Sequence, residues 1–264
     1  MLTLLTIIAI ALYLFAAVRQ WQRLHSPLPS LRAQVFGAGT LAWILQTNVT
    51  AQLLLGEGAL NLGLFPAGSL IATTVVMILL LSSLRQKLDN LFIGVFPMAA
   101  ITLLASLLSP ESGTAKMYSS GVVAHILLSL IAYSVLTLAA FQAILLSRQE
   151  RALKQHHTRG LVNSLPPLQV MERLLFDMIL AGFITLTLAL ITGFIYTEDL
   201  FAQHLAHKTL LSIIAWIVFA VLLAGRYMLG WRSRTALRWT LAGFILLMLA
   251  FFGSKAVLEL VIGK

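Results

Sequence analysis

The chain contains no cysteine among its 264 residues. Disulfide bonds, thiol catalysis, cysteine-ligated metal clusters and thioether attachment of a cofactor to this chain are therefore excluded. Acidic residues are also scarce, with 9 Asp and Glu against 18 Lys and Arg, and charged residues make up only 10% of the sequence. A surface that faces water on all sides cannot be built from so few charges.

The signatures of common soluble enzymes are missing as well. The sequence has no phosphate-binding Gly-Lys loop, no complete dinucleotide-binding glycine set and no zinc-protease helix motif. No residue pattern points to a catalytic group, so we expect the protein not to be an enzyme. The net charge of +9 does not predict nucleic-acid binding, because the basic residues are dispersed over short segments and form no basic, aromatic-bearing soluble domain.

Apolar sequence is abundant: 59% of the residues are hydrophobic and the mean hydropathy is +0.95. A helix that crosses a hydrocarbon layer roughly 30 Å thick needs about 20 apolar residues. The sequence therefore predicts an all-α, polytopic membrane protein, a bundle of eight transmembrane helices in a single integral membrane domain over residues 1–264. The eight predicted spans are Leu2–Val18, Val35–Leu55, Phe65–Leu84, Leu91–Leu108, Val122–Leu146, Leu174–Tyr196, Thr209–Tyr227 and Trp239–Leu260.

Threading these spans through a bilayer one after another separates the basic residues by side. Fourteen of the 18 Lys and Arg fall on one side, and only Lys116, Lys208, Lys255 and Lys264 fall on the other. Short cytoplasmic loops carry an excess of Lys and Arg, which predicts that both termini are periplasmic. The lipid bilayer is then a partner of the whole chain, and its anionic headgroups attract the basic loops.

Polar residues within the spans are few, and each needs a partner or a purpose in hydrocarbon. Arg173 and Asp177 lie four residues apart near the inner end of the sixth span, a spacing that predicts an interfacial ion pair. A second set gives the second span a polar side, which we expect to face other helices rather than lipid. Its members are Gln46, Asn48, Thr50 and Gln52.

Three histidines gather on the predicted outer side. His125 lies near the start of the fifth span, and His204 and His207 immediately precede the seventh, so all three share one leaflet. Two imidazoles that converge from separate helices can ligate a haem iron in an apolar cleft, and His125 with His207 or His204 would meet that requirement. The alternative is that each histidine simply bonds a neighbour at the interface.

Several longer runs carry a resemblance to a known family. They are His125 to Tyr133, the exit of the seventh span through Arg226 and Gly230 to Arg234, and Ala242 to Gly253. These runs resemble the CcsA/CcmC cytochrome c assembly family, whose members handle haem. The YpjD-type branch of that family is similar in further runs, namely Leu165 to Gln169, Met171 to Phe176, Glu198 to His204 and His207 to Thr209. In this resemblance His125 takes the place of an outer haem-ligating histidine.

The chain also departs from the family pattern. No tryptophan occurs from Glu198 to Thr209, where the family has a tryptophan-rich platform for haem, and Gln46 and Ala224 fall near the family's membrane-buried histidines. Only His125 transfers residue by residue. The second iron ligand is then His207 or His204, a choice that the sequence leaves open, and Glu198 or Asp199 would orient that imidazole.

The resemblance implies an inner-membrane, haem-binding or haem-handling protein of the bacterial plasma membrane, related to cytochrome c assembly. Non-covalent haem b would lie near the outer ends of the fifth and seventh spans, held by His125 with His207 or His204. Small residues there, Gly121, Ala124 and Ala132, would allow the macrocycle to approach. The alternative is a haem-free structural or regulatory partner of another membrane transport system. A secondary transporter ranks last, because the spans lack mid-membrane carboxylates.

Overall fold

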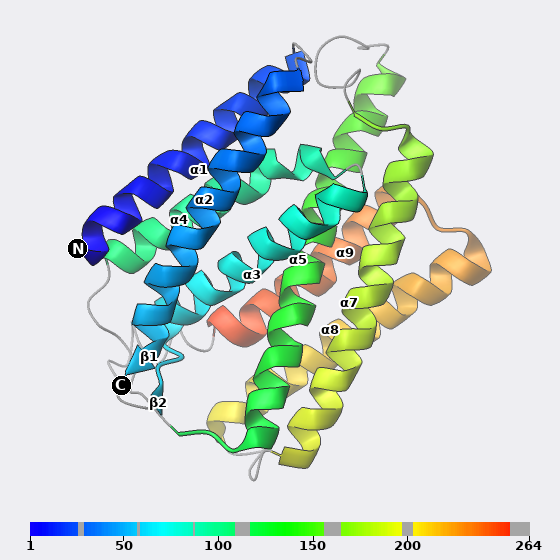
Figure 1. Ribbon diagram of the computed structural model, residues 1–264. Helices are drawn as coiled ribbons and strands as arrows, with labels where there is room; N and C mark the ends of the chain where they lie inside the picture. The colour runs from blue at the N-terminus through cyan, green and yellow to red at the C-terminus, as the bar shows by residue number, and fades with distance from the viewer. Residues whose placement is uncertain are drawn as a thin grey trace. The chain divides into compact units, whose positions relative to one another are not determined.

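The computed structural model describes residues 1–25, 29–56, 59–86, 88–108, 117–155, 165–196 and 203–253. Nearly all of these residues are helical (Figure 1). The chain divides into two compact units: unit 1 comprises residues 1–117 and 152–166, and unit 2 comprises residues 118–151 and 167–264. The single integral membrane domain expected from the sequence stays a prediction, because two compact helical units can both belong to one membrane-embedded domain.

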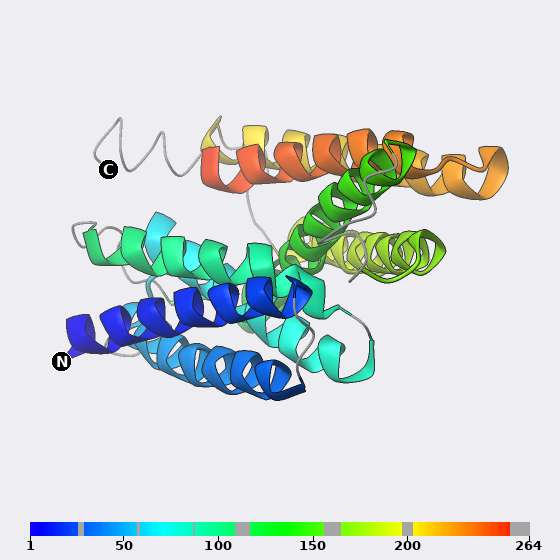
Figure 2. The same cartoon turned by 90° about the horizontal axis from the view of Figure 1, so that it is seen from above.

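Unit 1 is built on four long helices. They are α1 (Leu2–His25), α2 (Pro29–Leu54), α3 (Leu64–Arg85) and α4 (Phe92–Leu108). A two-residue strand pair, β1 (Leu55–Gly56) with β2 (Ala59–Leu60), connects α2 to α3, and the 3₁₀ turn η1 (Asp89–Leu91) precedes α4. In Figures 1 and 2, α1 runs alongside α2 and α4.

The centre of unit 1 is an aromatic cluster. Phe92 and Phe96 on α4 stack with ring centroids 4.7 Å apart, and Tyr13 on α1 lies 5.4 Å from Phe96. Gly39 on α2 makes room for this packing, because a Cβ at position 39 would lie 2.6 Å from the Cζ atom of Phe96. Small residues at such helix contacts let the backbones approach closely, which is how helices associate in lipid.

Unit 2 contains the helices α5 (Ser120–Lys154), α7 (Leu168–Tyr196), α8 (Gln203–Leu229) and α9 (Ser233–Met248), and the π-helical turn η2 (Leu249–Gly253). The last three residues of α5, after Arg151, belong to unit 1. Side-chain hydrogen bonds fix the direction of these helices. The start of α5 meets the end of α7 through His125 and Ala189, and Gln142, late in α5, donates to the carbonyl of Met171 at 3.0 Å. The helices α5 and α7 are therefore antiparallel.

The turn between α8 and α9 depends on Gly230, which adopts a left-handed backbone with φ of 65°. This conformation is open to glycine at little cost and ends α8. It carries the chain back so that the Trp231 amide donates to the Gly225 carbonyl at 3.1 Å. The Trp231 ring occupies the space left by the absent side chain of Gly225 and lies 5.4 Å from the ring of Trp239.

Seven helical segments of the described chain are long and apolar enough to cross a membrane. They are Leu2–Leu24, Leu64–Arg85, Asp89–Leu108, Ser120–Lys154, Leu168–Tyr196, His207–Leu229 and Arg234–Gly253. Their outward-facing side chains include many fully apolar ones, such as Leu4, Ile101 and Ile195, each more than half exposed. The prediction of a polytopic helical membrane protein is confirmed. The remaining predicted span, Val35–Leu55, corresponds to α2, which is long but more polar and is not among these seven.

The polar residues of α2 divide into two sets. Gln46 and Thr50 are buried in unit 1, where Gln46 Oε1 accepts a hydrogen bond from the Tyr13 hydroxyl at 2.6 Å. For these two the prediction of a helix-facing polar side is confirmed. It was wrong for Asn48 and Gln52, which are exposed. The four-residue spacing lets Gln52 Nε2 donate to Asn48 Oδ1 at 2.6 Å along the helix itself.

Candidate functional site

His125 is fixed between α5 and α7. It lies in the second turn of α5, half-buried, and its Nδ1 atom is 2.7 Å from the backbone oxygen of Ala189 on α7. A carbonyl oxygen can only accept a hydrogen bond, so Nδ1 must carry the proton that is shared. In the neutral ring, Nε2 then keeps its lone pair. The backbone of α7 thus selects one tautomer of this histidine.

The shape of α7 permits this arrangement. Gly193 lies one turn after Ala189, and a Cβ at position 193 would lie 3.0 Å from Cε1 and 3.1 Å from Nδ1 of His125. The imidazole therefore rests against a part of α7 that has no side chain. Ala189 is itself buried, and its carbonyl also accepts from the Thr192 hydroxyl at 3.0 Å. Together, Ala189 and Gly193 form a seat for the His125 ring.

An imidazole held in this way has a definite chemical capacity. Histidines that bind metal commonly donate their second ring N–H to a carboxylate or backbone carbonyl, which fixes the tautomer and the ring orientation. The His125–Ala189 bond supplies that second contact and leaves Nε2 as the atom able to bind iron. The same bond is also what an ordinary histidine at a helix interface would make. The geometry therefore fits an iron ligand without requiring one.

The other predicted ligands lie at the same end of unit 2. Trp216 of α8 donates to Thr187 of α7 at 2.8 Å, and Arg226 pairs with Glu172, so α8 is antiparallel to α7 and parallel to α5. Figure 1 shows α5 beginning, α7 ending and α8 beginning at this end. Trp216 and His125 contact positions only two residues apart on α7, Thr187 and Ala189, so they lie at nearly the same level. His207 precedes Trp216 by nine residues on α8, which places it about 10 Å beyond the level of His125 along the helices.

His207 is exposed on α8. His204 is in the first turn of α8, but its side chain lies outside the described residues. Glu198 and Asp199 lie outside the described residues altogether. Within the part of the chain that the structure describes, no group of three or more His, Asp or Glu is placed to hold a metal ion. The structure thus establishes the setting of His125, while the second ligand stays a prediction.

The small residues expected to admit a macrocycle have other surroundings. The space beside Gly121 is taken by the ring of Tyr196, since a Cβ at position 121 would clash with that ring. Ala132 is completely buried inside unit 2, and Ala124 is exposed. Of the three, Ala124 alone leaves open surface near His125 on the described part of α5. The other two serve helix packing.

The positions where the resemblance expects buried histidines carry no such ligand. Gln46 is fully buried, with its oxygen bonded to Tyr13 and its Nε2 without a partner in the described part of the chain. Ala224 is exposed on α8 and has no ligand atom. A buried haem held by two histidines at these positions is therefore excluded by the chemistry of the side chains present.

A second polar centre lies at the opposite end of unit 2, and the sequence did not predict it. Glu172 at the start of α7 binds Arg226 at the end of α8, with Nη1 and Oε1 2.5 Å apart, and Arg232 Nε is 3.6 Å from the same oxygen. The Arg226 guanidinium also lies over the Phe176 ring, 4.6 Å from its centroid, and donates to the Trp231 carbonyl at 3.2 Å. Glu172 thus joins α7, α8 and the turn after α8.

The predicted ion pair between Arg173 and Asp177 was wrong. Both side chains are exposed, and the structure, which describes both, shows no ion pair between them. The neighbouring Glu172 is the paired residue instead, because it points toward α8 and is only 14% exposed. The four-residue spacing of Arg173 and Asp177 suggested the wrong pair. The predicted order of membrane spans already placed Glu172 and Arg226 on the same side of the membrane.

Unit 1 has an equivalent centre at the end where α1 ends and α2 begins. Asp89 Oδ2 is 2.8 Å from Arg23 Nη1 and 3.3 Å from Arg32 Nε, and the Gln20 amide donates to the Asp89 carbonyl at 2.8 Å. Arg32 also donates to the Ser83 carbonyl at 3.4 Å. One carboxylate between two arginines therefore joins helix ends in each unit.

Comparison with known proteins identifies the family. A family model described as "Cytochrome C assembly protein" matches residues 35–262. The chain is 35% identical over 207 residues to the Inner membrane protein YpjD of Escherichia coli strain K12, covering 78% of each protein, and the same holds for YpjD of Escherichia coli O157:H7. It is 33% identical over 141 residues to an uncharacterized 28.8 kDa protein of Azospirillum brasilense, covering 53% of this chain and 52% of that one.

No solved structure matches the chain. The family match covers both units, and it includes His125, Glu172 and the turn after α8. The resemblance predicted from the runs around His125 and the YpjD-type segments is confirmed. The chain belongs to the cytochrome c assembly protein family.

Proposed function

We propose that this chain is an inner-membrane, haem-binding protein related to cytochrome c assembly, in which His125 ligates the iron of a non-covalent haem b. Family membership supports the proposal, and the relative from Escherichia coli is named as an inner membrane protein. The observation that carries it is the His125–Ala189 bond, which fixes the proton on Nδ1 and leaves Nε2 for a metal.

Haem, when bound, supplies an iron that accepts imidazole nitrogen as an axial ligand. The residues of the chain do the rest. Ala189 holds the His125 ring in the ligating tautomer, Gly193 gives that ring its space, and His207 or His204 contributes the second imidazole from α8. No residue in this arrangement is placed for covalent chemistry on a substrate, so the proposed role is binding rather than catalysis.

The proposal includes eight membrane crossings with both termini in the periplasm. The contacts within each unit support alternation. The end of α1, the start of α2 and the start of α4 meet at Asp89, and the start of α7 meets the end of α8 at Glu172. These are the ends at which the arginines concentrate, as expected for a cytoplasmic face. The 26 residues of α2 extend roughly 39 Å, long enough to cross with its neighbours.

Purification from haem-replete cells tests the proposal. We expect a low-spin Soret band in the absorbance spectrum, which weakens strongly in His125→Ala. A loss of the band in His207→Ala, with His204→Ala unaffected, would assign the second ligand to His207, and the reverse would assign it to His204. His156→Ala is the matched control, because this histidine lies between α5 and α7 in the sequence and is not among the predicted ligands. A colourless wild-type protein, or a band unchanged by His125→Ala, would contradict haem ligation.

A second function is favoured by the chemistry at Gln46. Where the resemblance expects a buried histidine, the chain has an amide that bonds Tyr13 within unit 1, and the tryptophan-rich platform is missing. A structural or regulatory partner of another membrane transport system would need neither. Co-purification of a transporter subunit with colourless protein would select this function over haem binding.

A further inference from the structure

The turn from α8 to α9 exposes three arginines that have little carboxylate near them. Arg232 is 75% exposed, and Arg234 and Arg238 are exposed as well. Arg234 and Arg238 are four residues apart on α9, so their charges share one face of that helix. The segment 203–253 contains no Asp or Glu at all. Within this segment, no charge on the chain itself offsets their mutual repulsion.

Among the described residues, the carboxylate found near this turn is that of Glu172, and it pairs mainly with Arg226. Glu172 lies 2.5 Å from Arg226, and its distance to Arg232 is 3.6 Å, longer than a hydrogen bond. The contrast with unit 1 is instructive, because there both nearby arginines, Arg23 and Arg32, bind Asp89. The carboxylate in unit 1 therefore contacts both of its arginines within 3.3 Å, whereas Arg232 in unit 2 is 3.6 Å from Glu172 and 75% exposed.

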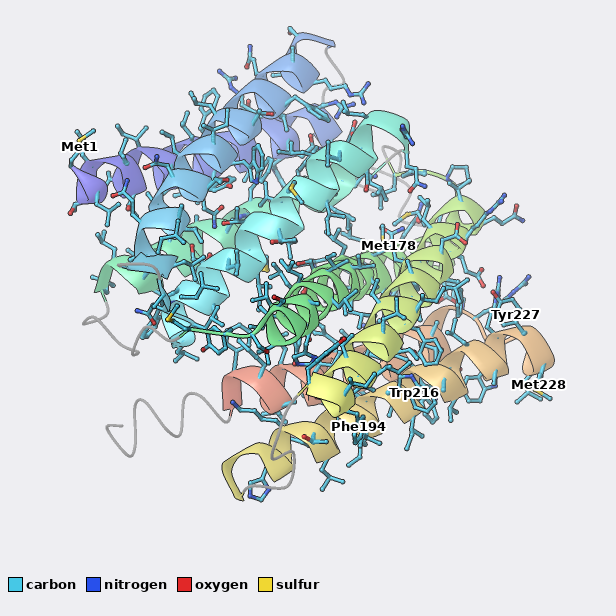
Figure 3. All side chains as sticks on the ribbon, turned by 60° about the horizontal axis from the view of Figure 1, so that its bottom comes forward. Met1, Met178, Phe194, Trp216, Tyr227 and Met228 are labelled. Carbon is cyan, nitrogen blue, oxygen red and sulfur yellow. The ribbon has the colours of Figure 1, made fainter. Side chains whose placement is uncertain are left out.

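The same turn exposes apolar side chains beside the arginines. Tyr227, Met228 and Leu229 are 72%, 82% and 70% exposed, and Figure 3 shows Tyr227 and Met228 projecting from the end of α8. They form the last turn of a helix that is apolar enough to cross a membrane. Trp231 and Trp239 follow directly, with their rings 5.4 Å apart, as is typical of aromatic side chains at headgroup depth.

We propose that this turn is a binding site for an anionic phospholipid. The phosphate lies against the guanidinium groups of Arg232, Arg234 and Arg238, and the acyl chains lie along the apolar last turn of α8. Guanidinium groups bind phosphate oxygens with two parallel hydrogen bonds, which makes arginine well suited to this headgroup. A site of this kind is more than the general attraction of basic loops, because it combines three exposed arginines with exposed apolar side chains at one place.

A lipid fits this surface better than an acidic protein does. The apolar part is continuous with a membrane-crossing helix, so it lies at the boundary of the hydrocarbon layer, where acyl chains are the neighbours. The arginines come immediately after that boundary, at the depth of the headgroups. A soluble acidic partner would match the arginines and leave the exposed Tyr227, Met228 and Leu229 without an apolar counterpart. The inference does not depend on whether the protein binds haem.

Native mass spectrometry of the purified protein tests the proposal with two lipids that have identical acyl chains, phosphatidylglycerol and phosphatidylcholine. We expect wild-type protein to retain phosphatidylglycerol preferentially. The double variant Arg234→Gln/Arg238→Gln should lower the affinity for phosphatidylglycerol roughly twenty-five-fold, since each arginine near the surface contributes about a five-fold gain. The matched control, Arg148→Gln/Arg151→Gln, removes two exposed arginines from the end of α5 and should keep the preference.

The outcomes separate a site from a general charge effect. An equal loss of affinity in the two double variants would overturn the proposal, and so would equal retention of both lipids by wild-type protein. An acidic protein that co-purifies through Arg234 and Arg238, with no preference for the anionic lipid, would assign the surface to a protein partner instead. Near-ultraviolet circular dichroism of each variant verifies that the fold is kept before lipids are compared.

Discussion

At the scale of single residues, the helix backbone of α7 decides what His125 can do. The ring donates from Nδ1 to Ala189 because no other proton position suits a carbonyl, and it fits because Gly193 carries no side chain. Neither Ala189 nor Gly193 has a side chain that could bind a metal, so neither would be chosen as a candidate ligand from the sequence. The chemistry of a histidine therefore depends on a carbonyl and on an absent methyl group, both supplied by a helix about 64 residues away in the sequence.

Substituting Gly193 by Ala should disturb His125 more than it disturbs the fold. An added Cβ would lie 3.0 to 3.1 Å from two ring atoms, so the imidazole must move and its bond to Ala189 must lengthen. Nitrogen NMR of the histidine rings should show a changed balance of tautomers. The thermal midpoint should change little, because alanine gains about 1 kcal/mol of helix propensity that offsets the strain.

Gly37→Ala is the matched control for this substitution. Gly37 is also a helical glycine, in α2, and a Cβ there would meet nothing within 4 Å. We expect this variant to raise the thermal midpoint and to leave the histidine spectrum unchanged. A wild-type tautomer balance in Gly193→Ala would show that Gly193 does not position the ring.

At the scale of helices, the arginine-bound carboxylates hold helix ends together. Glu172 joins α7 to α8, and Asp89 joins the end of α1 to the starts of α2 and α4. Both carboxylates are largely buried, at 14% and 15% exposed. Removing one charge from such a pair leaves the arginine without its partner, which costs more than the pair itself contributes.

Glu172→Gln should lower the free energy of unfolding by about 1 to 3 kcal/mol. The amide keeps the size of the side chain but loses the charge that holds Arg226 and Arg232. Asp177→Asn removes the same charge five residues later, where the carboxylate is exposed, and should change stability by less than about 0.5 kcal/mol. Unfolding in detergent, followed by tryptophan fluorescence, measures both. Equal effects in the two variants would mean that the Glu172 contact is not stabilising.

Helices were easier to predict from sequence than their ends and their partners. The predicted sixth span began at Leu174, yet α7 begins at Leu168, because the amides of Val170 and Met171 bond the Pro167 carbonyl and start the helix in polar sequence. Hydropathy detects the part of a helix in hydrocarbon, and a helix continues into the headgroups as long as its backbone bonds are satisfied. The pairing of Glu172 with Arg226 could not be predicted from the sequence either, because the packing of α7 against α8 decides which way each side chain faces.

At the scale of the whole molecule, the sequence predicts helices that alternate in direction across the membrane, and within unit 2 the helices α5, α7 and α8 do alternate in direction. The seating of His125 was beyond prediction, since it required knowing which turn of α7 faces α5. His125 itself could be selected from its position at the outer end of a span. The helix that hydropathy alone does not identify as a span is α2, whose polar residues lower its hydropathy although Gln46 Oε1 and the Thr50 hydroxyl have hydrogen-bond partners inside unit 1.

Cysteine labelling decides whether α2 crosses the membrane, and the natural absence of cysteine makes every introduced thiol unique. Ser30→Cys lies at the start of α2 and Leu55→Cys directly after its end, and both positions are exposed. If α2 crosses, a membrane-impermeant maleimide should label position 55 in intact spheroplasts and position 30 only after permeabilisation. Ser119→Cys, just before α5, should label with position 55, because the crossings of α3 and α4 cancel. If positions 30 and 55 label together, α2 does not cross, and eight crossings with both termini in the periplasm are contradicted. Arg23 and Arg32 would then lie across the membrane from Asp89 if α3 crosses, in conflict with the ion pairs that join them.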